Sequence, residues 1–139
     1  MAAGGARSKA RKRALDLLFA ADLRRESAGE TLDRSIAEGA APTNPYTETL
    51  VRGVVDHLTR IDEVLASYAQ GWTLDRMPAV DRNVLRIGVF ELLYVDDVPD
   101  AVAVTEALAL VRELSTDESP SFVNGVLGAI VKSKPSLIA

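Results

Sequence analysis

The stretch VDRNVLRIGVFELLYV, residues 80–95, constrains the fold of this chain more than any other. On a helix its apolar residues occupy most of the circumference, which is typical of a helix covered by neighbours on several sides. Helical periodicity also dominates the rest of the chain, and we find no convincing strand alternation. We therefore predict an all-α fold with residues 80–95 as its central helix. Because buried charges need partners, we expect Arg86 and Glu91 each to pair with a residue of another helix.

About seven helices follow from the apolar periodicity and from the residues that interrupt it. The expected helices cover about residues 8–26, 30–38, 45–57, 59–70, 80–95, 101–114 and 120–132. Ser8, Asn44 and Ser119 are the expected N-caps, and prolines follow the last two at first helical positions. The 139 residues predict one domain, in which a turn region with the only tryptophan separates helical groups at about 8–70 and 78–133.

Several kinds of chemistry lack the residues they need. The chain has no cysteine, so it has no disulfide, thiolate nucleophile or cysteine metal site. The only histidine, His57, is expected to be exposed or to cap a helix C-terminus. The acidic group Asp96, Asp97 and Asp100 is interpreted as turn and cap residues, since no calcium-loop spacing accompanies it. We therefore expect a binding protein, not an enzyme, with no metal and no cofactor.

The location follows from two further absences. No apolar run reaches the 18 residues or so that a membrane helix needs, and the N-terminus has no secretory signal pattern. A cytoplasmic protein without a membrane partner is the simplest interpretation.

Positive charge is concentrated at the N-terminus. Residues 1–25 carry seven basic and two acidic residues, a net +5, whereas residues 26–139 carry nine basic and eighteen acidic residues, a net −9. Five of the basic residues lie in RSKARKR: Arg7, Lys9, Arg11, Lys12 and Arg13. Cations at a helix N-terminus oppose the helix dipole, which favours a polyanionic partner. On charge alone, a solvated tail remains the alternative.

The stretch FVNGVLG combines apolar residues with Asn124, Gly125 and Gly128. Glycines weaken a helix, so we predict that this small strip packs closely against the central helix near Gly88, with Asn124 buried. The alternative is a contact with RNA, in which Phe122 stacks on a base and Asn124 forms a hydrogen bond.

These segments resemble the NusB family of bacterial transcription antitermination factors. The resemblance is carried by residues 84–114 and 119–130, with VPDAVAVTEA at 98–107 followed by FVNGVL, and by RKRALDLLFAADL at 11–23. It covers nearly the whole chain, and the combination of motifs is specific. It implies an all-α fold of two packed helical bundles.

The resemblance also implies a function in antitermination of rRNA transcription. Family members bind the box A element of the nascent RNA together with NusE, a small-subunit ribosomal protein, and act with other Nus factors on elongating RNA polymerase. Two alternatives remain: an RNA-binding domain like that of rRNA cytosine methyltransferases, which would need a long downstream domain, and a purely protein-binding helical module.

Site residues follow from the same resemblance. The five N-terminal cations named above are expected to contact RNA, as are Ser121 and Phe122 at the start of the last helix. Phe19 and Asp81 match the area where the family meets NusE.

A homodimer is a separate hypothesis, drawn from the first expected helix. Leu17, Ala20 and Ala21 lie outside its main apolar stripe and could form a second apolar side. A dimer through this side would mask the basic residues.

Overall fold

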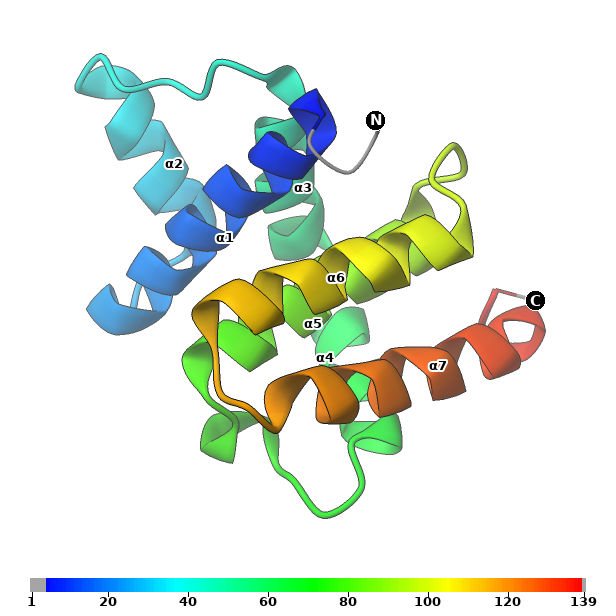
Figure 1. Cartoon of the computed structure of the whole chain (residues 1–139). Coiled ribbons are helices and arrows are strands. Elements are labelled where there is room, and N and C mark those ends of the chain that lie inside the picture. The colour runs from blue at the N-terminus through cyan, green and yellow to red at the C-terminus, as the bar shows by residue number, and fades with distance from the viewer. Residues whose placement is uncertain (1–4, 139) are drawn as a thin grey trace. The chain divides into compact units, whose positions relative to one another are not determined.

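The computed structural model describes residues 5–138, which form seven α-helices and one short 3-10 helix, with no strand in this range (Figure 1). The elements are α1 (Ala6–Arg24), α2 (Ala28–Ala37), α3 (Pro45–Asp56), α4 (Leu58–Tyr68), η2 (Leu74–Arg76), α5 (Ala79–Tyr94), α6 (Asp100–Leu114) and α7 (Ser119–Leu137). The all-α prediction is confirmed. None of the described helices is long and apolar enough to cross a membrane.

The chain forms two compact units, and the division lies between Asp56 and His57. The sequence analysis grouped the helix at 59–70 with the first half of the chain. Its contacts instead assign α4 to the second unit, where it packs on α5 and α7. The difference arises because the loop at 71–78 is the more conspicuous break in the sequence, although α4 packs against the helices that follow it.

The first unit is a three-helix bundle in which α1, α2 and α3 pack against one another. Leu18 of α1, Leu32 of α2 and Leu50 of α3 are buried at its centre. Leu23, expected in the apolar stripe of α1, lies at the margin of that stripe and is 69% exposed. Ser8 was expected to cap α1 but lies inside it, because the helix begins two residues earlier at Ala6.

A capping box sets the start of α2. The side chain of Ser27 accepts a hydrogen bond from the Gly29 N–H (3.1 Å), and Glu30 accepts one from the Ser27 N–H (3.3 Å). The helix therefore begins at Ala28, two residues before the predicted start. The Ser-x-x-Glu pattern of this motif is present in the sequence and was not used for the prediction.

Glu26, between α1 and α2, provides a pH-dependent interaction. Arg34 and Thr31 donate hydrogen bonds to its carboxylate (both 2.7 Å), and these bonds lower the pKa of Glu26 below its ordinary value. Because the folded-state pKa is the lower one, this stabilisation is present above the ordinary pKa and is lost as the pH falls through the folded-state value. We expect Glu26→Gln to lose less stability than the wild type between about pH 6 and about pH 3.

Urea unfolding at the two pH values measures this difference. The Glu26→Gln variant and the wild type would show the same pH dependence if Glu26 contributed nothing.

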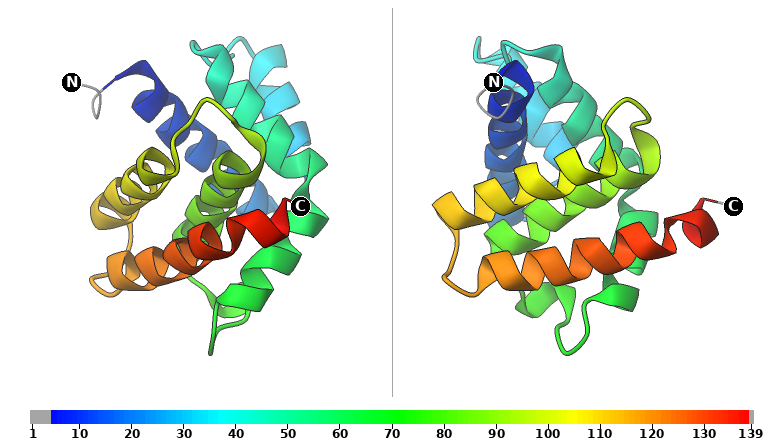
Figure 2. Two further views of the ribbon diagram at one scale, coloured as in Figure 1. Left: turned by 90° about the vertical axis from the view of Figure 1, so that its right-hand side faces the viewer. Right: turned by 45° about the vertical axis from the view of Figure 1, so that its right-hand side comes forward.

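In the second unit α5 packs against α4, α6 and α7, and α6 and α7 lie side by side (Figure 2). Ten of the 16 residues of α5 are buried. The prediction of a central helix is therefore confirmed.

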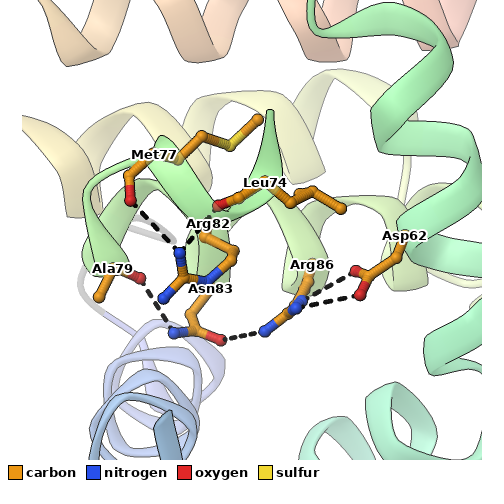
Figure 3. Close-up of polar contacts among 7 residues, drawn as sticks. All are labelled: Asp62, Leu74, Met77, Ala79, Arg82, Asn83 and Arg86. Atoms are coloured by element: carbon orange, nitrogen blue, oxygen red, sulfur yellow. Dashed lines mark hydrogen bonds and ion pairs between the residues drawn. The ribbon is translucent and has the colours of Figure 1, made fainter. Parts of the chain in front are cut away.

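Polar side chains on α5 are paired, as predicted for Arg86. Its guanidinium donates to both oxygens of Asp62 on α4 (2.9 and 3.0 Å) and to the Oδ1 atom of Asn83 (3.2 Å) (Figure 3). Asn83 in turn donates to the carbonyl of Ala79, and neighbouring Arg82 donates to carbonyls at the start of the unit. Arg86 thus connects α5 to α4. Glu91, the other predicted buried charge, is 1% exposed.

The crossing of α5 and α7 differs from the prediction. A Cβ atom at Gly88 would lie 3.1 Å from Leu127 Cδ1, so the close approach is between Gly88 and a leucine side chain. Cβ atoms at Gly125 and Gly128 would meet nothing within 4 Å, and Asn124 is exposed. The predicted strip of small residues is therefore wrong. The physical reason is that α7 buries Val123, Leu127 and Ile130, which share one face, and this turns residues 124 and 125 outward.

Three predicted terminal residues have different outcomes. Asn44 caps α3 as expected, because its Oδ1 atom accepts the Tyr46 N–H (2.9 Å). Ser119 was expected to cap α7 but is its first residue, since Glu118 occupies the N-cap position. His57 precedes α4 and caps no helix C-terminus, and its ring stacks on Tyr94 with the centroids 3.9 Å apart.

Candidate nucleic-acid interface

The basic segment predicted from the sequence forms the first two turns of α1. Its N-cap, Gly5, has no side chain to accept the free N–H groups, and no acidic residue lies in the first turn. Neither feature neutralises the positive helix end, to which the five cations add. This end of the first unit is therefore strongly electropositive.

The start of α3 holds these turns in place through the backbone of α1. Asn44 donates a hydrogen bond to the carbonyl of Ala6 (3.2 Å), and the Thr47 hydroxyl donates one to the carbonyl of Ala10 (2.9 Å). Both acceptors lie on one face of α1, since they are four residues apart. The basic turns are thus an ordered part of the bundle.

Two of the five cations lie over an aromatic ring. The guanidinium carbon of Arg7 is 4.1 Å from the centroid of the Tyr46 ring, and that of Arg11 is 5.7 Å from it. Tyr46 is buried, and Arg11 is only 4% exposed. Cation–π contacts of this kind stabilise by about 0.5–2 kcal/mol, more when they are desolvated.

The other side of the same turns borders a cleft of about 290 Å³. Lys9 and Arg13 line it from α1, and Thr43, Asn44 and Pro45 line it from the segment before α3. No acidic side chain takes part in this lining. Lys9 is exposed, and Arg13 is half-buried and donates a hydrogen bond to the carbonyl of Ala40 (3.4 Å). Lys12 is exposed as well.

The second unit contains the two remaining residues predicted to contact RNA. Ser121 is exposed near the start of α7. Phe122 is half-buried, and its ring centroid lies 6.1 Å from that of Trp72, which is 50% exposed. Both aromatic residues line a cleft of about 280 Å³ that also includes Glu118. The sequence analysis placed Trp72 in a turn but gave it no role, and its position as the only tryptophan in a loop is the signal that it overlooked.

No group of three or more metal-ligating side chains could hold an ion within the described residues. Of the acidic group considered in the sequence, Asp100 accepts a hydrogen bond from Lys134 (2.7 Å). The described geometry therefore offers binding surfaces and clefts, and the most distinct of these is the basic end of α1.

A family comparison decides what these surfaces belong to. The model of the NusB family matches residues 8–132. The chain belongs to the NusB family. A transcription antitermination protein NusB of Nocardioides sp. is 75% identical over 132 residues, which cover 95% of this chain and 98% of the relative. One of Thermobifida fusca is 55% identical over 133 residues, which cover 96% and 94%.

Solved NusB structures have the same fold. The NusB structure of T. maritima superposes with a TM-score of 0.82 at 32% identity and covers 92% of each chain. A crystal structure of the antitermination factors NusB and NusE in complex with dsRNA matches with a TM-score of 0.79 at 32% identity, covering 91% of this chain and 96% of the other.

In this NusB-family chain, the two residues predicted to contact NusE lie in different units. Phe19 is half-buried on α1. Asp81 on α5 is 2% exposed, and its carboxylate accepts hydrogen bonds from Ser115 (2.5 Å) and Ser119 (2.8 Å). These bonds tie the turn between α6 and α7 to the start of α5. Asp81 therefore shapes this end of the second unit from within.

The apolar side that suggested a homodimer is largely covered in this NusB-family fold. Leu17 and Ala21 are each 3% exposed, and Ala20 is half-buried. These residues do not form an exposed apolar patch, and the homodimer stays a hypothesis.

Proposed function

We propose that this chain is a transcription antitermination factor that binds box A RNA of rRNA transcripts together with NusE. With other Nus factors it acts on the elongating RNA polymerase. The observation that carries the proposal is the ordered basic end of α1 in a NusB-family chain whose remaining residues are acidic. The complex of NusB and NusE with dsRNA, formed by proteins of the same fold, supports both partners.

The proposed RNA contacts are the cations of α1, together with Ser121 and Phe122. The proposed NusE contacts are Phe19 and the surface that Asp81 organises. A basic ribosomal protein is electrostatically complementary to an acidic chain, which favours its encounter with this factor. The function requires no catalysis, and a factor that works on the transcription complex acts in the cytoplasm.

Fluorescence anisotropy with a short single-stranded box A RNA tests the proposal. The protein is titrated alone and with NusE, at about 50 and about 200 mM salt, against box A and a scrambled sequence. If all five cations met phosphates, log K would change with log salt at a slope of about −3.5, a loss of roughly a hundredfold between these concentrations. We expect salt-sensitive binding that strengthens with NusE and weakens on the scrambled RNA.

One result would favour a purely protein-binding module instead. In that case the protein would bind NusE but no RNA at either salt concentration. The basic end of α1 would then be a solvated surface of the bundle.

A further inference from the structure

We propose that the cations of α1 divide into two sets with different functions. Lys9 and Arg13 contact a phosphate of the RNA backbone in the cleft beside α3, whereas Arg11 is a positioning residue that fixes α1 on the Tyr46 ring. The inference rests on the proposed function and specifies which part of the basic segment contacts the nucleic acid.

Helix geometry explains the division. Ala6 and Ala10 form the row of α1 that faces the start of α3, since both carbonyls accept hydrogen bonds from it. Successive helical residues are about 100° apart, so the row of Lys9 and Arg13 and the row of Arg7 and Arg11 lie on opposite flanks of that contact. One flank meets the Tyr46 ring, and the other borders the cleft.

Arg11 has the surroundings of a positioning residue. It is 4% exposed, and its guanidinium lies 5.7 Å from the centroid of a buried tyrosine ring. An RNA phosphate in contact with Arg11 would have to enter the packed region between α1 and Tyr46. Its stem and planar head instead extend the contact that Thr47 makes with the α1 backbone.

The cleft has the features that a phosphate requires. It offers an ammonium group from Lys9, a guanidinium group from Arg13 and the hydroxyl of Thr43, without a carboxylate in the lining. A guanidinium can donate two parallel hydrogen bonds to a phosphate, and an ammonium adds a compact charge. Asn44 already caps α3, so these side chains, not the helix end, supply the attraction.

The salt dependence of RNA binding separates the two sets, because the slope counts phosphate contacts. We expect Lys9→Gln and Arg13→Gln each to reduce the magnitude of the slope by about 0.7 in complexes with NusE and single-stranded box A RNA. Arg11→Met is expected to leave the slope unchanged while it lowers the melting temperature. Arg24→Gln, which removes an exposed cation at the other end of α1, is the matched control and should change neither slope nor binding.

A second variant covers the case in which Arg11→Met fails to fold. Tyr46→Leu keeps all five cations and removes the ring, so the slope should stay at the wild-type value while the melting temperature falls. An unchanged melting temperature in Tyr46→Leu would contradict the positioning role. So would a reduced slope with unchanged melting temperature in Arg11→Met. Unchanged slopes in both Lys9→Gln and Arg13→Gln would contradict the phosphate site.

The failure of the proposed function gives a different pattern. If the wild type bound no RNA even with NusE, inorganic phosphate would be titrated against the wild type and the Lys9→Gln, Arg13→Gln double variant by NMR. Phosphate-dependent shifts at the cleft in the wild type alone would keep the phosphate site and reject the RNA. Equal or absent shifts in both proteins would overturn the site itself.

Discussion

Gly88→Val is expected to destabilise the protein by about 1–3 kcal/mol, since it adds three carbons to a crossing that is already filled. A Cβ atom at this position would lie 3.1 and 3.2 Å from the two terminal carbons of Leu127. Leu127 is fully buried, so its side chain has little room to move away. Urea unfolding followed by circular dichroism measures the loss as a lower midpoint at an unchanged slope with urea.

Gly125→Ala is the matched control, on the helix that crosses α5. Its added methyl group meets nothing within 4 Å, so only the helix propensity changes. We expect Gly125→Ala to stabilise the protein by about 0.5–1 kcal/mol. Equal stability of Gly88→Val and the wild type would show that the crossing has free space, contrary to the described packing.

Asp62→Ala is expected to have the second large effect, a loss of about 2 kcal/mol. The variant removes both oxygens that accept from Arg86, whose side chain is only 14% exposed. Breaking a fully buried pair costs about 3–5 kcal/mol, and the 28% exposure of Asp62 lowers the expected value. Chemical denaturation of the purified variant measures the loss.

The double variant Asp62→Ala, Arg86→Met distinguishes an unpaired charge from a general loss of packing. Replacing both partners with apolar groups removes the charge left without its carboxylate, so the double variant should regain more than half of the lost stability. A double variant that is less stable than Asp62→Ala would contradict this explanation.

Local signals in the sequence predicted much of the fold. The apolar circumference of residues 80–95 identified α5 as the central helix, and Asn-Pro identified the start of α3. Both depend on neighbouring residues in the chain. The partner of Gly88 depends on the rotation of α7 about its own axis, which the spacing of small residues did not determine. The inward row Val123, Leu127 and Ile130 has the stronger apolar period.

The site was predictable in outline and not in its division of labour. The charge of RSKARKR located the basic surface, because charge is a property of sequence alone. Which cations face Tyr46 depends on how α3, more than 30 residues later, packs against α1. Asp81 shows the same limit, since its partners Ser115 and Ser119 lie on another turn of the fold.

Transcription through a terminator tests the central claim most directly. Purified RNA polymerase, NusE and the other Nus factors transcribe a template with box A upstream of a terminator, with and without this protein. We predict more readthrough when the protein is present, and loss of that gain when box A is scrambled. Readthrough that is the same with and without a protein shown to bind NusE would contradict the proposed antitermination function.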